Sequence, residues 1–224
     1  MEQTQQKIID YYNAFYSAEG FSYYPPAFTK AVLKSLCRKA GVAPGTRVLD
    51  VGCATGYYSA ILASLGYDVT GIDISETGIQ KARERYPDIR FEVQDATALP
   101  YAKGSFDFVF ALGVSVANTR DLGELHRWLE HLMGVLTPGG TLALLGGSTL
   151  TGAVSEHSDW FNHTWGEIKG FIPSWATQVR GPWLTHFRLM QMLPPSLSMN
   201  GVMTRLMRWV PMGFQRRIVL LLKK

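Results

Sequence analysis

The stretch RVLDVGCATGYYSA, residues 47–60, interrupts an apolar run with a loop of small residues and then continues in a helical pattern. A dinucleotide fingerprint, G-x-G-x-x-G counted from Gly52, would require glycine at positions 54 and 57, where the chain has alanine and tyrosine. The Gly-Lys-Ser/Thr ending of a phosphate-binding loop is absent as well. Small residues let a ligand approach the backbone, with free N–H groups pointing at it. Asp50, two residues before Gly52, would repel a pyrophosphate and suits a cation such as an ammonium or sulfonium group.

Short apolar runs alternate with helical patterns on both sides of this stretch. The patterns predict strands at 47–51, 68–73, 89–95, 106–112 and 141–146, and helices at 55–65, 76–86 and 122–136. Two further helices are expected before them, at 3–17 and 27–40, with Pro25 and Pro26 between them. Strands that alternate with helices indicate an α/β fold, Rossmann-like, with a doubly wound and mostly parallel sheet covered on both faces.

We expect a single domain, residues 1–224, in four parts. Residues 1–40 form N-terminal helices, 41–147 the core, 148–215 an irregular insertion rich in Trp, Pro, His and Met, and 216–224 a closing strand. The first ten residues have no apolar signal-peptide core, and the run IVLLL is too short to span a bilayer. Cys37 and Cys53 form neither a disulfide framework nor a metal-ligand pattern. These features predict a cytoplasmic protein with reduced thiols and no metal site.

Basic residues concentrate toward the C-terminus. Residues 168–224 carry nine Lys and Arg and no Asp or Glu, whereas residues 1–167 have a net charge of −5. This asymmetry indicates either an anionic partner for the C-terminal part or a solvated basic surface. The segment 201–222 also mixes apolar residues with arginines, as segments at a membrane surface do, although Pro211 interrupts any single long helix.

Five motifs, in order along the chain, resemble those of the class I S-adenosylmethionine-dependent methyltransferases. They are VLDVGCATG (48–56), GIDIS (71–75), QDATALP (94–100), FDFVFALG (106–113) and LTPGGTLAL (136–144). The resemblance covers about residues 47–146, nearly half of the chain, and its successive acids, Asp50, Asp73 and Asp95, are about 22 residues apart. One such motif is a weak signal, whereas five collinear motifs are specific. The resemblance implies S-adenosylmethionine as cofactor and S-adenosylhomocysteine as product.

The resemblance also implies roles for individual residues. Asp73 would bind both ribose hydroxyls, because a bidentate carboxylate suits a vicinal diol. Asp95 would accept from the exocyclic amine of adenine, and Ala111 would lie beside the methionine end. Ala54 departs from the commoner glycine by one methyl group, so binding should survive. The full expected cofactor-binding set is Asp50, Gly52, Cys53, Ala54, Gly56, Asp73, Ile74, Asp95, Ala96, Ala111 and Tyr16.

The family has no fixed catalytic base, so the acceptor has to be inferred from the N-terminal helix and the insertion. In similar small-molecule methyltransferases a tyrosine-bearing N-terminal segment covers the cofactor as a lid, and here the tyrosines also suit packing of the helix on the core. They are Tyr11, Tyr12, Tyr16, Tyr23 and Tyr24. His163 and His157 are the candidate bases, against a purely structural role for each, and a base is needed only where the acceptor must lose a proton.

These observations predict a methyltransferase that acts by in-line displacement on an oxygen or nitrogen of a small, anionic metabolite. Two alternatives are a membrane-surface methyltransferase acting on a lipid or quinone, and a regulatory protein that binds S-adenosylmethionine without turnover. A nucleic-acid partner is not expected, because residues 112–118, LGVSVAN, lack the Asn/Asp-Pro-Pro-aromatic motif of base methyltransferases. We expect a small-molecule partner, peripheral membrane contact under the second hypothesis, and a monomer or homodimer.

Overall fold

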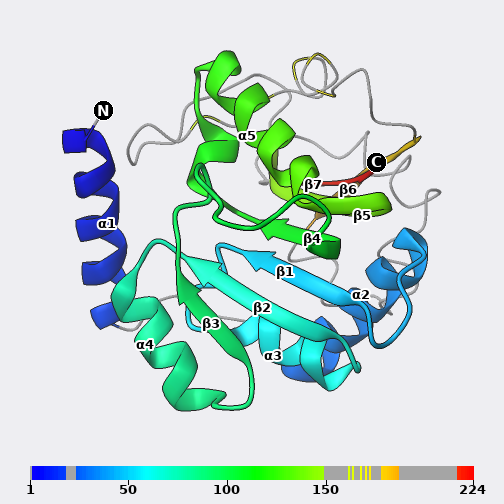
Figure 1. Ribbon diagram of the computed structural model, residues 1–224, viewed down its shortest axis with the longest axis horizontal. Helices are drawn as coiled ribbons and strands as arrows, with labels where there is room; N and C mark the ends of the chain where they lie inside the picture. Colours follow the sequence, from blue (N-terminus) through cyan, green and yellow to red (C-terminus); the bar gives the residue numbers. More distant parts are fainter. Residues whose placement is uncertain are drawn as a thin grey trace.

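The structure, a computed structural model, describes residues 2–18, 24–148, 178–186 and 216–224, together with residues 161, 163, 167, 170 and 172. Its centre is a seven-stranded sheet in the order β3-β2-β1-β4-β5-β7-β6 (Figure 1). The strands are β1 Arg47–Val51, β2 Asp68–Asp73, β3 Arg90–Val93, β4 Phe106–Leu112, β5 Leu136–Ser148, β6 Gln178–His186 and β7 Arg216–Lys223. The helices are α1 Glu2–Ser17, α2 Pro26–Ala40, α3 Tyr57–Ser64, α4 Glu76–Arg85 and α5 Leu122–Gly134, with a 3₁₀ turn, η1, at Ser115–Asn118.

The sheet is mostly parallel, as the alternating pattern predicted. β1 pairs in parallel with β2 and β4, and further parallel pairs join β2 to β3 and β4 to β5. β7 is antiparallel to both of its neighbours, β5 and β6. The strand order reverses between β1 and β4, and in such sheets ligands bind outside the carboxyl ends of the strands at this point.

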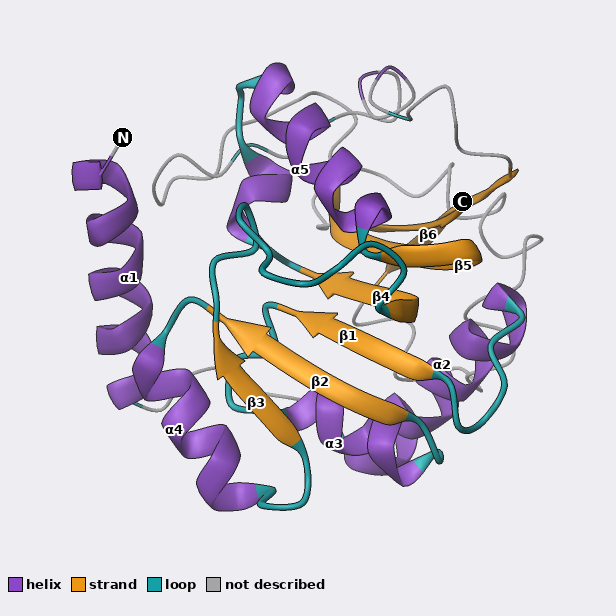
Figure 2. Cartoon of the chain, viewed as in Figure 1, coloured by secondary structure: helices purple, strands orange, loops and turns teal. Residues whose placement is uncertain are grey.

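Helices cover both faces of the sheet (Figure 2), so most residues of the central strands β1 and β4 are buried, the carboxyl group of Asp50 among them. On one face Leu49 and Val51 of β1 share a buried cluster with Trp128 and Leu132 of α5. On the other face Val48 belongs to a second cluster, which includes residues of α2 and α3. Alternate residues of one strand therefore pack into two separate cores, which fixes its register.

The bounds of three predicted strands, at 47–51, 68–73 and 106–112, are confirmed. β5 begins at Leu136, five residues before the predicted strand, because the Pro138-Gly139-Gly140 turn is a bulge inside it. The pairing jumps from Phe106↔Leu136 to Phe108↔Thr141, and Gly139 has a φ of 79°. β6 was not predicted, since its sequence lies in the part of the chain for which no pattern was recognised.

α1 lies beside α4, on the side of the molecule toward which the arrowheads of β1 and β2 point (Figure 1). This arrangement brings the N-terminal helix to the carboxyl ends of the strands. Among the described residues, no helix combines the length and apolar character needed to cross a bilayer.

Candidate functional site

The loop between β1 and α3 has a left-handed backbone at three alternate positions. Gly52, Ala54 and Gly56 have φ angles of 74°, 54° and 82°. Glycine adopts this conformation without a steric penalty, whereas a Cβ opposes it. This left-handed conformation explains why glycine is the commoner residue at this position in the family. Ala54 adopts the same conformation despite its Cβ.

The N–H groups of this loop bond within the protein, which corrects the expectation that they are free to meet a ligand. Gly52 and Cys53 both donate to the Ile72 carbonyl, at 2.8 and 2.9 Å, and Gly56 donates to the Cys53 carbonyl at 2.9 Å. Ala54 donates to Oδ2 of Asp73 at 2.9 Å. Three of these four bonds hold the loop against the end of β2, and the fourth lies within the loop, so none of the four N–H groups is presented to an anion.

The missing side chains of Gly52 and Gly56 leave room for the protein's own residues. A Cβ on Gly56 would lie 2.8 Å from Cζ of Phe91, and one on Gly52 would lie 3.1 Å from Cγ2 of Val114. The two glycines thus bring the loop close to the core, and their place in a cofactor site stays a prediction. Cys53 is also buried, and burial raises the pKa of its thiol, so it is not a reactive cysteine.

Asp73 ends β2 and faces the loop. Its Oδ2 accepts from Ala54, and its Oδ1 accepts from the N–H of Ser75 at 2.9 Å. The side chain is 7% exposed, and burial raises its pKa while the bonded N–H groups oppose that rise. Each oxygen of a carboxylate can accept more than one hydrogen bond, so this fixed carboxylate retains capacity for two hydroxyl donors. Ile74, the next residue, is half-buried.

Asp50 lies deeper than the sequence suggested. Its carboxyl group is 1% exposed, and Ser59 of α3 donates to its Oδ2 at 2.5 Å. Burial, followed by the charge of Asp73, raises the pKa of Asp50 to about 7, against the opposing effect of the Ser59 bond. Direct contact between Asp50 and a cationic ligand would therefore require the loop to open.

Asp95 follows β3 and lies at the same edge of the sheet. Its Oδ1 accepts from the N–H and the hydroxyl of Thr97, both at 2.8 Å. Its Oδ2 accepts from Nε2 of Gln5, in α1, at 2.5 Å. Ala96 is half-buried beside it, and Ala111 is fully buried near the end of β4. The structure thus brings Asp73, Asp95 and Ala111 to the carboxyl ends of β2, β3 and β4, with β1 lying between β2 and β4.

Comparisons with known proteins agree with this arrangement. Residues 48–140 match the protein family described as a methyltransferase domain. This part of the chain is therefore similar in sequence to methyltransferase domains, and it is called the methyltransferase domain below. The match spans the loop, both carboxylates at the carboxyl edge, and the strands on either side of the point where strand order reverses.

Curated relatives match the methyltransferase domain over a limited length. A demethylmenaquinone methyltransferase of Renibacterium salmoninarum is 40% identical over 105 residues, which are 46% of this chain and 42% of that protein. A 2-methyl-6-phytyl-1,4-hydroquinone methyltransferase of Synechocystis sp. is 42% identical over 105 residues, 45% of this chain and 32% of that protein. The chain therefore spans less than half the length of these curated relatives.

Solved structures match nearly the whole chain in fold. A methyltransferase of Methanosarcina mazei, described as SAM-dependent, has a TM-score of 0.64 at 18% identity and covers 91% of this chain and 99% of its own. Magnesium protoporphyrin IX methyltransferase from Synechocystis, solved with bound SAM, has a TM-score of 0.62 at 17% identity. The match covers 97% of this chain and 96% of that protein's chain. The fold of the methyltransferase domain thus continues through β6 and β7.

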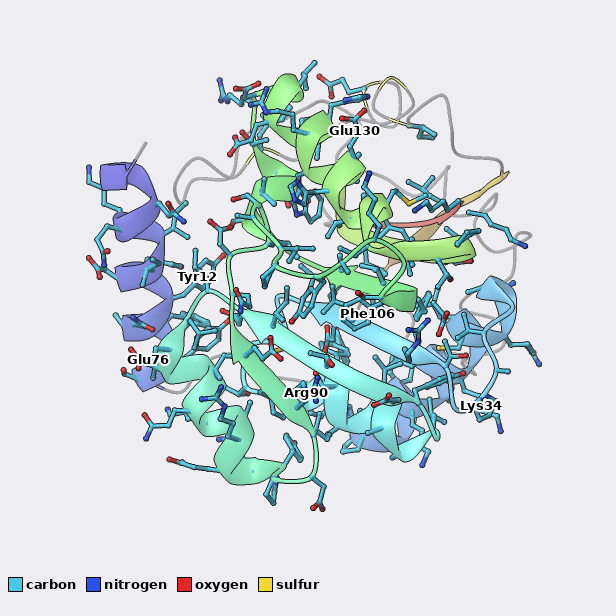
Figure 3. All side chains as sticks on the ribbon, in the orientation of Figure 1. Tyr12, Lys34, Glu76, Arg90, Phe106 and Glu130 are labelled. Carbon is cyan, nitrogen blue, oxygen red and sulfur yellow. The ribbon has the colours of Figure 1, made fainter. Side chains whose placement is uncertain are left out.

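α1 covers the site edge of the methyltransferase domain. Tyr12 extends from α1 toward the sheet (Figure 3), where it forms a hydrogen bond with Ser115, and burial and the nearby charge of Asp73 raise its pKa. Tyr16, the predicted cofactor residue, is 3% exposed and packs against Gly78 of α4, where a Cβ would lie 3.0 Å from its ring. Of the N-terminal tyrosines, Tyr16 was predicted from the sequence as a cofactor residue, whereas Tyr12 lies near Asp73. The position of Tyr12 in a helix could not distinguish it from the other tyrosines.

Two described residues of the insertion are bonded to the segment that follows β4. Phe161 donates its N–H to the Asn118 carbonyl at 2.7 Å, and Nδ2 of Asn118 donates to the Phe161 carbonyl at 3.0 Å. His163 is 3% exposed, and its Nε2 lies 2.8 Å from the Thr119 carbonyl. Because a carbonyl only accepts, Nε2 carries the proton, and burial lowers the pKa of the ring. His163 thus has a demonstrated structural contact, while His157 lies outside the described residues.

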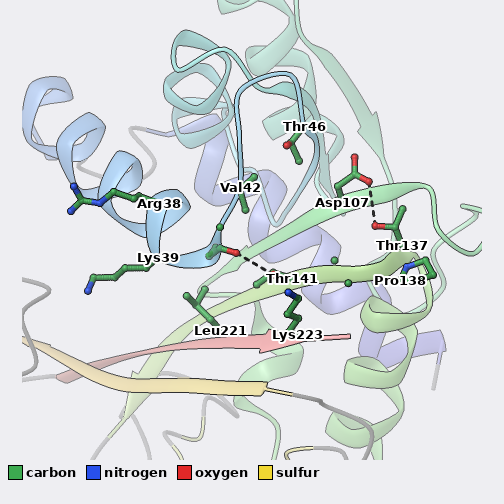
Figure 4. A pocket seen from close by; sticks show the side chains of 14 residues that line it. Arg38, Lys39, Val42, Thr46, Asp107, Thr137, Pro138, Thr141, Leu221 and Lys223 are labelled. Atoms are coloured by element: carbon green, nitrogen blue, oxygen red, sulfur yellow. Dashed lines mark hydrogen bonds between the residues drawn. The ribbon is translucent and has the colours of Figure 1, made fainter.

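A cavity of about 300 Å³ lies at the opposite edge of the sheet, beside the amino ends of β1 and β4 (Figure 4). It is lined by Thr46, Asp107 and Lys223, among others, and contains none of the predicted site residues. Asp107 is held there by Arg47, whose Nη2 lies 2.9 Å from Oδ1. Arg38 and Lys39 extend away from Lys223, so the cations of this cavity do not converge on one point.

Proposed function

We propose that this protein binds S-adenosylmethionine at the carboxyl ends of β1, β2 and β3 and transfers its methyl group to a small molecule. The observation that best supports this proposal is the position of Asp73 at the end of β2. Its nearly buried carboxylate is held by the N–H groups of Ala54 and Ser75, which orient its two oxygens. A carboxylate in this position fits the vicinal hydroxyls of a ribose. Asp95, one strand away, fits an amine donor.

The bound cofactor would supply the chemistry, an activated methyl group open to in-line displacement. The residues of this chain bind, orient and exclude water. Asp73 and Asp95 hold the nucleoside, and Tyr12 places an aromatic ring over the site edge, where it suits the cationic end of the cofactor. No proton transfer by His163 is required unless the acceptor must be deprotonated, and its Nε2 is already bonded to Thr119.

For the acceptor we favour an oxygen or nitrogen of a small anionic metabolite, in the cytoplasm, because the segment from residue 168 onward is basic and free of acids. A quinone or lipid acceptor at a membrane surface is the second candidate. The relatives named for demethylmenaquinone and for a phytyl hydroquinone favour it, and so does the mixture of apolar residues and arginines at 201–222.

Asp73→Ala tests the cofactor assignment. It should weaken the binding of S-adenosylhomocysteine by about 2–3 kcal/mol, because two hydrogen bonds to a charged group are lost. Calorimetric titration of the purified protein measures this loss. Asp68→Ala is the matched control, because Asp68 is exposed at the amino end of the same strand. An unchanged dissociation constant for Asp73→Ala would contradict the assignment, and Asp73→Asn, which keeps one oxygen for the loop N–H groups, separates lost binding from lost folding.

The acceptor is tested with methyl-labelled S-adenosylmethionine and an extract of the protein's own source. Label in the small-molecule filtrate supports the metabolite hypothesis, whereas label in the lipid extract supports the quinone or lipid hypothesis. Binding of the cofactor without formation of S-adenosylhomocysteine would instead indicate a regulatory protein.

A further inference from the structure

The contact between Gln5 and Asp95 joins α1 to the edge of the proposed nucleoside site. Asp95 accepts three hydrogen bonds, two of them on Oδ1 from its neighbour Thr97. The third, on Oδ2, comes from the side-chain amide of Gln5, 90 residues away in the sequence. Oδ2 is therefore the oxygen that faces away from the local turn, and a side chain of α1 holds it.

The Gln5 amide is chemically similar to the group that the proposed function assigns to this oxygen. The NH₂ of a carboxamide and the exocyclic amine of adenine are both neutral, planar N–H donors. Both need the same acceptor at the same place. Because a carboxylate oxygen can accept more than one hydrogen bond, Gln5 and the adenine ring compete for the space beside Oδ2 of Asp95, on the side that faces away from Thr97, and not for its lone pairs.

The two ends of α1 are attached differently. Near its C-terminal end, Oδ1 of Asn13 accepts from the Ser75 hydroxyl at 2.7 Å and from the Thr77 N–H at 3.2 Å. Lys81 of α4 donates to the Tyr16 carbonyl. Among the described residues, Gln5–Asp95 is the hydrogen bond that joins residues 5–10 to another element. Gln5 lies eight positions before Asn13, about 12 Å along a helix. Release of the Gln5–Asp95 bond would therefore free the N-terminal part of α1, while Asn13 keeps the rest of the helix attached.

We propose that Gln5 is a latch, which holds α1 closed over the site by occupying the adenine position at Asp95 and is displaced when the cofactor enters. This inference rests on the proposed function, because it needs Asp95 to bind the amine of adenine. The Gln5–Asp95 bond is exposed to solvent, so it costs little to break. Asn13 keeps α1 attached to α4, so the helix can return after binding.

Gln5→Ala tests the latch, and Gln6→Ala is the matched control. Gln6 is the adjacent residue, and its amide bonds to Asp10 within α1 at 2.8 Å, so the control removes the same group without touching the site. S-adenosylhomocysteine is the probe, with association rates measured by stopped flow and dissociation constants by calorimetry. If closed α1 excludes the ligand from most molecules, Gln5→Ala should bind about threefold to tenfold faster and tighter than the wild type. Gln6→Ala should match the wild type.

The outcomes separate the latch from the proposed function. Equal binding by Gln5→Ala and Gln6→Ala, or weaker binding by Gln5→Ala alone, overturns the latch, because the amide then either does not compete or contacts the ligand directly. S-inosylhomocysteine, which has a carbonyl in place of the amine, tests Asp95 independently. A wild-type preference for the adenosyl compound supports the role of Asp95 even if the latch fails. Failure of the wild type to bind S-adenosylhomocysteine overturns both proposals.

Discussion

Asp50 illustrates what burial does to a single carboxyl group. Its ordinary pKa is about 4 in an unfolded chain, whereas in the folded protein burial raises the pKa to about 7. Between these values the folded state holds a proton that the unfolded state has released. Its stability therefore falls as the pH rises through this window and levels off above it.

Asp50→Asn should remove this dependence. The amide oxygen still accepts from Ser59, and the side chain cannot ionise, so the variant should gain stability over the wild type as pH rises from about 4 to about 8. The gain should reach at most about 4 kcal/mol. Urea denaturation at both ends of this range measures it. Asp107→Asn is the control, because Arg47 holds the pKa of Asp107 below its ordinary value. Its contribution to stability is lost only below about pH 4, so the difference between this variant and the wild type should stay constant across the range. A constant difference between Asp50→Asn and wild type would contradict the prediction.

The residues of the site could be predicted only where their role is local. Asp73 and Asp95 were recognised because each belongs to a short motif that resembles those of the family, one at the last residue of β2 and the other two residues after β3. The use of the loop N–H groups was wrong because their acceptors, Ile72 and Asp73, come from the next strand. Gln5 gave no signal at all, since its contact depends on how a separate helix docks.

At the scale of elements, Asn13 decides the position of α1. Asn13→Ala exchanges a poor helix former for the best one, yet it removes the acceptor for Ser75 and for Thr77. α1 should therefore remain helical but detach more often, with hydrogen exchange in residues 2–18 about fivefold faster for a loss of about 1 kcal/mol. Hydrogen exchange followed by mass spectrometry provides the measurement. Ser17→Ala is the control, because the Ser17 hydroxyl bonds to the Asn13 carbonyl inside the same helix, and the bond from Lys81 uses the Ser17 backbone carbonyl, which alanine keeps. Equal exchange in both variants would contradict the assigned role.

The elements themselves follow from periodicity where one pattern dominates. β1, β2 and β4 are short, largely buried strands with apolar residues on both faces, and their bounds were predicted. The Pro138-Gly139-Gly140 turn was recognised, but a turn and a bulge within a strand have the same composition, and only pairing with β4 distinguishes them. The resemblance predicted an N-terminal lid over the cofactor, but it did not predict the docking of α1 on α4, because no periodicity encodes a contact between distant segments.

At the scale of the whole molecule, the antiparallel pairing of β7 with β5 determines where two arginines of the basic C-terminal part lie along the sheet. Arg216 pairs with Ser148, and Arg217 with Gly147, at the carboxyl end of β5. β4 ends opposite Leu145, so both arginines lie beyond this point, at the edge of the sheet that carries Asp73 and Asp95. Lys223 pairs with Thr141, toward the other edge.

This register predicts that the two arginines serve the acceptor rather than the cofactor. With the acceptor fraction identified by label transfer, Arg216→Gln combined with Arg217→Gln should raise the KM for an anionic acceptor about tenfold and weaken its dependence on salt. Affinity for S-adenosylhomocysteine should stay within about twofold, because β1, β4 and β5 lie between β7 and β2 in the sheet, and charges separated by more than a Debye length are largely screened. Lys223→Gln removes a charge from the same strand at the opposite edge and should change neither quantity. An unaltered KM in the double variant would remove the arginines from acceptor binding and favour the uncharged quinone, because an uncharged acceptor gains nothing from two cations at this edge.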